Sequence, residues 1–326
     1  MARVVMVTGA AGMVGSHLVD RLLADGLEVH ALDIVPFAEA NNLRESADHP
    51  NFHYVQGDIR NRETVVRFFR PEAEVLYHLA SVVGVRRYME DPMGLIDVAI
   101  IGTRNFIELC DRHGVRILFT STSEVYGRNP KVPWKESDDR VLGATNVDRW
   151  SYSTSKATVE HMLFGMHRKS GLPMSIVRFF NVYGPRQNPI YAVSQSVYRV
   201  LRGEAPDRYD GGTQTRCFTY IDDAIDGLIA AATSDKAVGE IFNIGNPTEV
   251  TIGDVVRACI ELSGADLKPI DIDTGEKYGA VYEDIIRRVP EVSKAKELLG
   301  WEARTDYREG IARTLDWARQ NPWYLT

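Results

Sequence analysis

Short apolar runs alternate with longer stretches of helical periodicity along the first part of the chain. The runs are rich in β-branched residues, which is typical of buried parallel strands. We expect strands at Arg3–Thr8, Glu28–Val35, Phe52–Val55, Glu74–Leu79, Val115–Thr120 and Met174–Phe179. We expect helices at Met13–Ala24, Gly94–His113 and Tyr152–Ser170. Strands that alternate with helices predict right-handed crossovers, and therefore an α/β fold with a doubly wound parallel sheet.

After Asn181 the expected helices and strands become shorter, and prolines and glycines separate them. We therefore expect a sheet domain over residues 1–181, with later segments near 217–246 returning to it. Residues 182–326 are expected to form mainly a smaller C-terminal lobe that binds substrate. The last regular pieces are expected to be the helices Ser293–Leu299 and Arg308–Trp317.

The bulk composition is that of an ordinary soluble protein. The 326 residues are 44% hydrophobic and carry a formal net charge of −7, so no broad basic surface indicates a nucleic-acid partner. Three cysteines, Cys110, Cys217 and Cys259, lack metal-ligand spacing, and we expect no metal site. No apolar run reaches the roughly 18 residues that span a bilayer. With no signal peptide recognised at the N-terminus, a cytoplasmic protein without a membrane partner is expected.

A glycine-rich turn lies between the first strand and the first helix. It reads Gly9-Ala-Ala-Gly12-Met13-Val14-Gly15, a variant of the turn that lets a backbone approach a pyrophosphate at a helix N-terminus. Asp33 ends the next strand, where a carboxylate accepts hydrogen bonds from ribose hydroxyls and disfavours a 2′-phosphate. The pattern predicts a Rossmann-type domain that binds NAD through these residues. Asp58 and Ile59 follow the third strand and suit the adenine edge, although Asp58 is equally suited to cap a helix.

A second motif, Tyr152-Ser-Thr-Ser-Lys156, places a phenol and an ammonium four residues apart on one helix. A phenol with a pKa near 10 is a poor base at neutral pH. A nearby ammonium and a cationic nicotinamide would favour the phenolate. Tyr152 is therefore the candidate base.

Together with Thr122, these motifs resemble the extended short-chain dehydrogenase/reductase family that modifies nucleotide sugars. The resemblance covers nearly the whole chain and includes residues 78–81 (HLAS), 178–186 (RFFNVYGPR), 214–220 (QTRCFTY), 242–245 (FNIG) and 295–301 (AKELLGW). It implies that NAD is reduced and reoxidised within one cycle. Tyr152 and Thr122 would act on the sugar 4-hydroxyl, and Lys156 would hold the cofactor ribose. The strand-end residues Leu79, Ala80 and Ser81 would also border the cofactor.

The stretch 121–127 (STSEVYG) separates the reactions of this family. Dehydratases of the family carry Asp-Glu where this chain has Ser123-Glu124, and epimerases usually lack the second carboxylate. The stretch most resembles UDP-glucuronic acid decarboxylases, which implies that Ser123 and Glu124 govern chemistry at C5. The segment 82–87 departs from those decarboxylases. A C4 epimerase, a 4,6-dehydratase and, outside enzymes, an NAD-sensing regulatory protein remain alternatives.

The substrate nucleotide, expected to be UDP, would meet Asn181, Arg216, Arg287 and Arg288, because guanidinium groups pair with phosphate in a bidentate manner. Which of the two neighbouring arginines binds the diphosphate is left open. By resemblance, the helices Gly94–His113 and Tyr152–Ser170 would form the seam of a homodimer. His78 and Arg186 are expected to be structural.

Overall fold

The computed structural model describes residues 3–84, 90–273, 285 and 287–326. Its centre is a seven-stranded sheet in the order β11-β6-β5-β4-β1-β2-β3, in which every neighbouring pair is parallel. The strands are β1 (Val4–Thr8), β2 (Glu28–Asp33), β3 (Phe52–Gln56), β4 (Val75–His78), β5 (Arg116–Thr122), β6 (Met174–Phe179) and β11 (Glu240–Ile244). The expected α/β class is confirmed.

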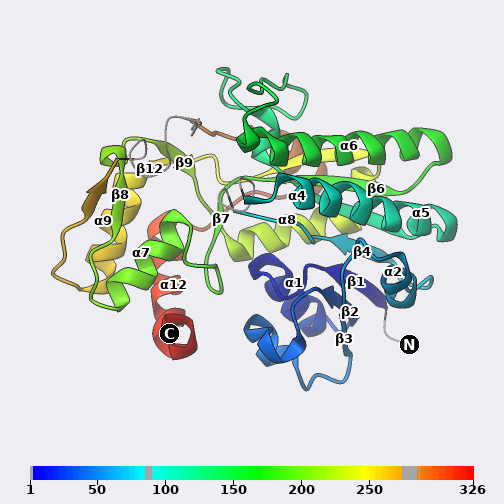
Figure 1. The fold of residues 1–326 in the computed structure, drawn as a ribbon, viewed down its shortest axis with the longest axis horizontal. Coiled ribbons are helices and arrows are strands. Elements are labelled where there is room, and N and C mark those ends of the chain that lie inside the picture. Colours follow the sequence, from blue (N-terminus) through cyan, green and yellow to red (C-terminus); the bar gives the residue numbers. More distant parts are fainter. Residues whose placement is uncertain (1–2, 85–89, 274–284, 286) are drawn as a thin grey trace.

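Helices cover both faces of this sheet (Figure 1). One face carries the core of α2, α5 and α6, and the other carries α1 and α8. The helices of this domain are α1 (Met13–Ala24), α2 (Arg62–Phe68), α4 (Pro92–Asp97), α5 (Thr103–His113), α6 (Ser151–Ser170) and α8 (Ile221–Thr233). The strand order reverses between β1 and β4, and a crevice at the carboxyl ends of strands at such a point is where ligands bind in this architecture.

The expected helix Gly94–His113 is not continuous. It consists of α4, a π-helical turn at Val98–Gly102 and α5. At this turn Gly102 lies against Ile59, so that a Cβ on Gly102 would stand 2.4 Å from Ile59 Cδ1. Close packing of the helix on the segment after β3 thus coincides with the interruption, which hydrophobic periodicity does not reveal.

After Val182 the elements become short and form a second group, seen at the left of Figure 1. Three two-stranded pairs join β10 to β7, β12 to β9 and β13 to β8. Their strands are β7 (Val182–Tyr183), β8 (Asp207–Tyr209), β9 (Thr215–Cys217), β10 (Thr219–Tyr220), β12 (Glu249–Thr251) and β13 (Ile270–Ile272). The helices here are α7 (Ala192–Leu201), α9 (Ile252–Ser263) and α12 (Tyr307–Gln320). The helix α11 (Ser293–Leu299) instead packs against β11 and α8 of the sheet domain.

Between these short pairs the chain returns to the main sheet. The helix α8 follows β10, and β11 then pairs with β6 at the sheet edge. Arg186, in the segment after β7, donates to Asp20 on α1 at 2.6 Å and to Glu45 at 3.2 Å. These ion pairs tie the second group of elements to the first, which fits the structural role expected for Arg186.

Candidate active site

The glycine turn after β1 is held by close backbone packing. Gly9 has φ +73°, and a Cβ there would stand 2.7 Å from the backbone nitrogen of Ala80. A Cβ on Gly15 would stand 2.1 Å from the carbonyl oxygen of Gly9. Both positions therefore require glycine for the turn itself. The same contacts place Ala80, which follows β4, beside the turn.

Gly12 is different, because packing within the described residues does not require it. A Cβ on Gly12 would meet only the Gly9 carbonyl oxygen, at 3.3 Å. Gly12 also begins α1 without a side-chain cap. The first backbone N–H groups of this helix, those of Met13, Val14 and Gly15, therefore lie at an uncapped and uncrowded N-terminus, which favours an anion. These features fit the pyrophosphate of a dinucleotide.

Asp33, at the carboxyl end of β2, lies beside this turn. Its carboxylate accepts hydrogen bonds from the backbone N–H of Ala11 at 2.9 Å and of Val35 at 3.1 Å. The carboxylate is therefore fixed at the strand end where a ribose is expected. With the glycine turn, this arrangement fits NAD.

Asp58 and Ile59 follow β3, as expected. Asp58 does not cap a helix: the cap of α2 is Asn61, whose side chain accepts from the N–H of Thr64. Asp58 instead accepts from Arg60, with contacts of 3.0 and 2.6 Å to one carboxylate oxygen, and this guanidinium lowers the pKa of Asp58. The alternative role weighed for Asp58 is thus wrong, because the chain turns for three more residues before the helix begins.

Tyr152 lies on the first turn of α6 and is only 8% exposed. Its hydroxyl forms hydrogen bonds with the side chains of Thr122, at the end of β5, and Ser81, in the segment that follows β4. Burial raises the pKa of Tyr152, and the Glu124 carboxylate raises it further, while the two hydrogen bonds lower it. The candidate base and its expected hydrogen-bond partner Thr122 are therefore brought together, and Ser81 joins them.

Lys156 lies one turn further along α6 and is buried. Its Nζ donates to the carbonyl oxygen of Thr120 at 2.7 Å and stands 5.9 Å from the centre of the Tyr152 ring. Burial lowers the pKa of Lys156 to about 7, against the opposing effect of Glu160. The backbone bond to Thr120 thus holds the ammonium group close to the Tyr152 ring.

Glu124 is 9% exposed and lies between two arginines. Arg149 donates to Oε2 at 2.5 Å, and Arg288 donates to Oε1 at 3.1 Å. Burial alone would raise the pKa of Glu124, but the two guanidinium groups lower it to about 2. The carboxylate is therefore ionised at neutral pH.

Ser123 and Glu124 begin a 3-10 turn, Ser123–Tyr126, directly after β5. Thr122 caps this turn, since its Oγ1 accepts from the Glu124 N–H at 3.2 Å. The strand end thus presents Thr122 to Tyr152 and then turns Glu124 towards the arginines. Ser123 is buried at 2% exposure.

The residues expected to bind the nucleotide divide into two places. Arg216 and Arg287 both lie near the Cys217 thiol, on the pair of strands β9 and β12. Burial raises the pKa of Cys217 to about 12, and the charges of the two arginines oppose this increase. Arg287 is paired bidentately with Glu249, both contacts at 2.8 Å. Its neighbour Arg288 instead belongs to the Glu124 cluster.

Asn181 follows β6 and has φ +35°. Its Oδ1 is buried and has no hydrogen-bond partner among the described residues. Such an orphaned acceptor marks a place where a ligand donor would be favoured.

Sequence reasoning missed Arg149. It precedes Tyr152 by three residues and is 3% exposed. Its burial is the informative signal, since arginine is rarely buried without a charged partner, and burial cannot be read from the sequence. His78 was expected to be structural, and it is fully buried between Thr8 Oγ1 at 2.8 Å and Thr103 Oγ1 at 3.0 Å.

Similarity to known proteins supports the expectation of an NAD-binding active site. The model of the NAD dependent epimerase/dehydratase family matches residues 5–245. The chain belongs to this family. Membership confirms NAD as the expected cofactor, and it confirms the expected class of enzyme, one that acts on nucleotide sugars.

Two curated relatives within the family are decarboxylases. One is a UDP-N-acetyl-α-D-glucosaminuronate decarboxylase of Bacillus cytotoxicus, 34% identical over 97% of this chain and 97% of the relative. The other is UDP-glucuronic acid decarboxylase 6 of Arabidopsis thaliana, 37% identical over 94% of this chain and 86% of the relative. Both are enzymes, which disfavours the regulatory alternative.

Solved structures of the family show the same fold with other reactions. One is a UDP-glucose 4-epimerase of Thermotoga maritima, solved with UDP-glucose, which matches with a TM-score of 0.87 and 29% identity. The match covers 98% of this chain and 99% of the epimerase chain. A dTDP-glucose 4,6-dehydratase of Streptomyces venezuelae, solved with NAD, has a TM-score of 0.86, 28% identity and 98% coverage of both chains. The fold and cofactor are thus shared across reactions that differ at the sugar.

Proposed function

We propose that this protein decarboxylates UDP-glucuronic acid to UDP-xylose or to the UDP-4-keto-pentose. NAD, which the glycine turn and Asp33 would hold, would supply the acceptor for the C4 hydride and would return that hydride when UDP-xylose is formed. Tyr152 takes the proton of the 4-hydroxyl, which leaves a ketone at C4. The C6 carboxylate is then β to a carbonyl, so the C5–C6 bond breaks, CO2 leaves, and the electron pair passes to the C4 oxygen before C5 is protonated.

The observation that carries this proposal is the cluster of Glu124, Arg149 and Arg288. Two guanidinium groups meet the Glu124 carboxylate in a buried place. The Glu124 carboxylate acts on the pKa of Tyr152, which places the cluster near the candidate base. Guanidinium groups near the candidate base favour an anionic group on the substrate, such as the C6 carboxylate of a uronic acid.

Arg288 has a further feature that suits this role. Its Nε is buried and has no hydrogen-bond partner among the described residues. A substrate carboxylate would give this donor an acceptor. Because Glu124 is held ionised, it is suited to orient the arginines rather than to supply a proton as an acid does.

A second substrate and a second reaction are also candidates for this protein. The Bacillus relative named above acts on a uronate with an N-acetyl group at C2, so UDP-N-acetylglucosaminuronate is a second candidate for the same chemistry. C4 epimerisation is a further candidate, supported by the similarity to the Thermotoga epimerase. With a neutral sugar such as UDP-glucose, epimerisation would need no arginines to bind a carboxylate.

The deciding experiment incubates the protein with NAD and, in parallel, UDP-glucuronic acid, UDP-N-acetylglucosaminuronic acid and UDP-glucose. We expect a product lighter by CO2 from a uronate, detected by mass spectrometry. A uronate returned with unchanged mass and an inverted C4, detected by NMR, would favour the epimerase. Loss of water from UDP-glucose would favour the dehydratase.

We further propose that Asn181, Arg216 and Arg287 hold the UDP part of the substrate. The buried orphan oxygen of Asn181 supports this, as does the gathering of both arginines on the β9–β12 pair. In this proposal residues 1–181, with the returning segments near 217–246, bind NAD, and 182–326 mainly bind the nucleotide sugar. The two substitutions Arg287→Ala and Arg216→Ala should weaken UDP binding and leave NAD binding unchanged.

We also propose a cytoplasmic homodimer. All three cysteines are buried free thiols, which suits a reducing compartment. Large apolar side chains are exposed on α4 and the adjoining π turn, with Met93 at 67% and Ile101 at 45%, which supports a seam on this side. Light scattering should then give twice the chain mass of 36.6 kDa. The part of the chain that the structure describes contains no helix suited to crossing a membrane.

A further inference from the structure

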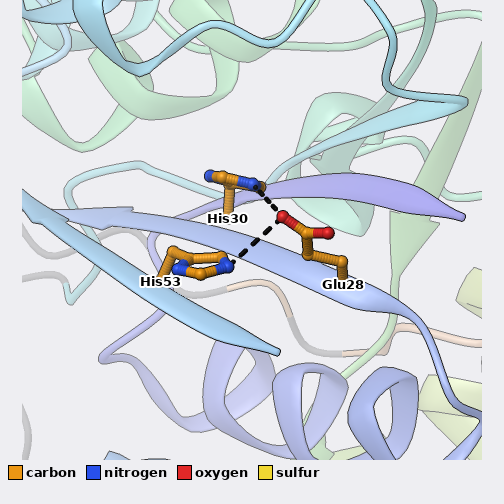
Figure 2. Close-up of side chains that lie close together, drawn as sticks. All are labelled: Glu28, His30 and His53. Atoms are coloured by element: carbon orange, nitrogen blue, oxygen red, sulfur yellow. Dashed lines mark hydrogen bonds and ion pairs between the residues drawn. The ribbon is translucent and has the colours of Figure 1, made fainter. Parts of the chain in front are cut away.

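Two histidines and a glutamate converge at the edge of the sheet where β2 meets β3. Figure 2 shows the Glu28 carboxylate reaching both imidazoles. His30 Nε2 lies 3.0 Å and His53 Nε2 lies 3.3 Å from the same oxygen, Glu28 Oε1. One ligand atom from each residue lies within 4.8 Å of the other two. The two rings stack with their centres 4.6 Å apart.

The backbone fixes this grouping. His30 and His53 are register partners in the parallel pair of β2 and β3. Glu28 lies two residues before His30 on β2, and residues two apart on a strand point to the same face. All three side chains thus stem from regular strands, so the cluster is largely pre-formed. Spacing along the chain does not reveal it, because the third member comes from a different strand.

We propose that Glu28, His30 and His53 form a binding site for a divalent transition metal ion, of which Zn²⁺ is the best fit. Bonds of about 2.0–2.1 Å to imidazole nitrogen and carboxylate oxygen place tetrahedral ligands roughly 3.3 Å apart. The two His–Glu separations are already close to this value, so small side-chain rotations would suffice. Imidazole ligands favour zinc, copper and nickel over magnesium and calcium. This proposal replaces the expectation of no metal site that rested on sequence spacing.

The exposure of the three residues suits a site that an ion can enter. His30 is buried, whereas the side chains of His53 and Glu28 are 45% and 34% exposed. The ion would therefore meet solvent on one side and keep its fourth position for water. His30 Nδ1 is buried and has no hydrogen-bond partner among the described residues. An imidazole bound through Nε2 would keep a proton on that nitrogen, which limits the affinity.

The place of the cluster indicates a structural role. Glu28 begins β2 and Asp33 ends it, so the cluster and the cofactor turn lie at opposite ends of one strand. A bound ion would bridge β2 and the edge strand β3 and stabilise this side of the sheet. It would bind the folded protein more tightly than the unfolded chain and thus raise the melting temperature.

The test is a titration of the chelator-treated full chain with Zn²⁺ by calorimetry, together with thermal melts. We expect one ion per chain and a melting temperature that rises with Zn²⁺. His53→Ala and Glu28→Gln should each weaken binding at least tenfold and remove the thermal shift. The matched control is His161→Ala, which alters an exposed histidine on α6 and should bind as the wild type does.

A second readout reports the ligands directly. Co²⁺ in a site with two nitrogens and one oxygen should give visible absorption bands that His53→Ala abolishes. Both site variants alter partly exposed side chains, and their melts without metal show whether they remain folded. The proposal is overturned if the wild type binds no stoichiometric ion, or if folded His53→Ala and Glu28→Gln bind it as tightly as the wild type.

Discussion

The chemical role of the Glu124 side chain depends on the residues that contact it. The residue follows β5 in a stretch of hydroxyl groups, and its identity alone allows a proton donor, a proton acceptor or a structural anion. Two guanidinium groups at 2.5 and 3.1 Å decide between these, because they hold the carboxylate ionised. Tyr152 is affected in the opposite sense, since burial and the Glu124 charge disfavour its phenolate.

Glu124→Gln should lower both stability and decarboxylation. The substitution removes the charge that compensates Arg149 and Arg288, and breaking a buried ion pair in this way costs about 3–5 kcal/mol. Urea unfolding measures this loss. The matched control is Glu309→Gln, whose carboxylate pairs with Arg313 on the surface and should change stability by about 0.5 kcal/mol or less. Equal unfolding midpoints for the two variants would contradict the buried pairing.

Tyr152→Phe should remove the redox step while leaving the fold intact. We expect turnover to fall by roughly 10²-fold or more, because the base that accepts the 4-hydroxyl proton is lost. NAD binding should remain measurable by fluorescence. Tyr324→Phe is the control, since it removes a buried hydroxyl that donates to the Gln187 carbonyl oxygen and should keep turnover. Wild-type turnover in Tyr152→Phe would exclude this base.

The turn between β1 and α1 shows how an element is built for a ligand as well as for its own packing. Gly9 and Gly15 lack the room for a Cβ, whereas Gly12 has it. The glycine pattern in the sequence therefore mixes two requirements. Two of the glycines let the strand, turn and helix pack, and the third leaves space in front of an uncapped helix N-terminus.

Alanine substitutions should separate these requirements. Gly12→Ala should melt near the wild-type temperature but bind NAD at least tenfold more weakly, because its Cβ would enter the space meant for the pyrophosphate. Gly9→Ala should lower stability as well, since its Cβ would clash with Ala80 at 2.7 Å. Gly26→Ala is the control: it has a similar φ of +79° and nothing within 4 Å, so it should cost only the roughly 1–2 kcal/mol of left-handed strain.

At the scale of the whole molecule, polar contacts join the sheet domain to the segment after β7. Arg186 pairs with Asp20 and Glu45, and His17 Nε2 lies 3.2 Å from the Pro185 carbonyl oxygen. Burial, followed by the charge of Arg186, lowers the pKa of His17 to about 4. A neutral His17 is thus part of the junction between the two parts of the chain.

This junction predicts a pH dependence of stability. The folded-state pKa of His17 lies below its ordinary value of 6.5. The stability that the neutral imidazole contributes is therefore fully present above pH 6.5 and is lost as the pH falls towards 4. Over that window the free energy of unfolding should fall by up to about 1.4 kcal/mol per pH unit from this group.

His17→Gln, which keeps a donor for Pro185, should flatten the profile of urea midpoints between pH 6.5 and 4. His161→Gln alters an exposed histidine on α6 and should leave the slope unchanged. The same slope in wild type and His17→Gln would show that this histidine is not held neutral by the fold.

Local pattern alone was sufficient for much of the architecture. The helix Met13–Ala24, the strand Met174–Phe179 and the helix Ser293–Leu299 have the bounds expected from periodicity, because each is flanked by residues that end a regular element. The glycine turn, Asp33 and the Tyr152 motif could also be found this way, since each lies within one short stretch whose chemistry is local.

Tertiary structure decided what depends on residues far apart in the chain. Arg288 meets Glu124 across 164 positions, and His53 meets Glu28 and His30 only because β3 pairs with β2 in one register. The charge of Glu124 depends on the two arginines that fold against it, and burial, which lowers the pKa of Lys156, likewise exists only after folding. The sequence by itself determined most elements of the sheet domain and the cofactor turn, whereas the partners and charge states of the catalytic groups follow from the packing of distant segments into a site of low dielectric.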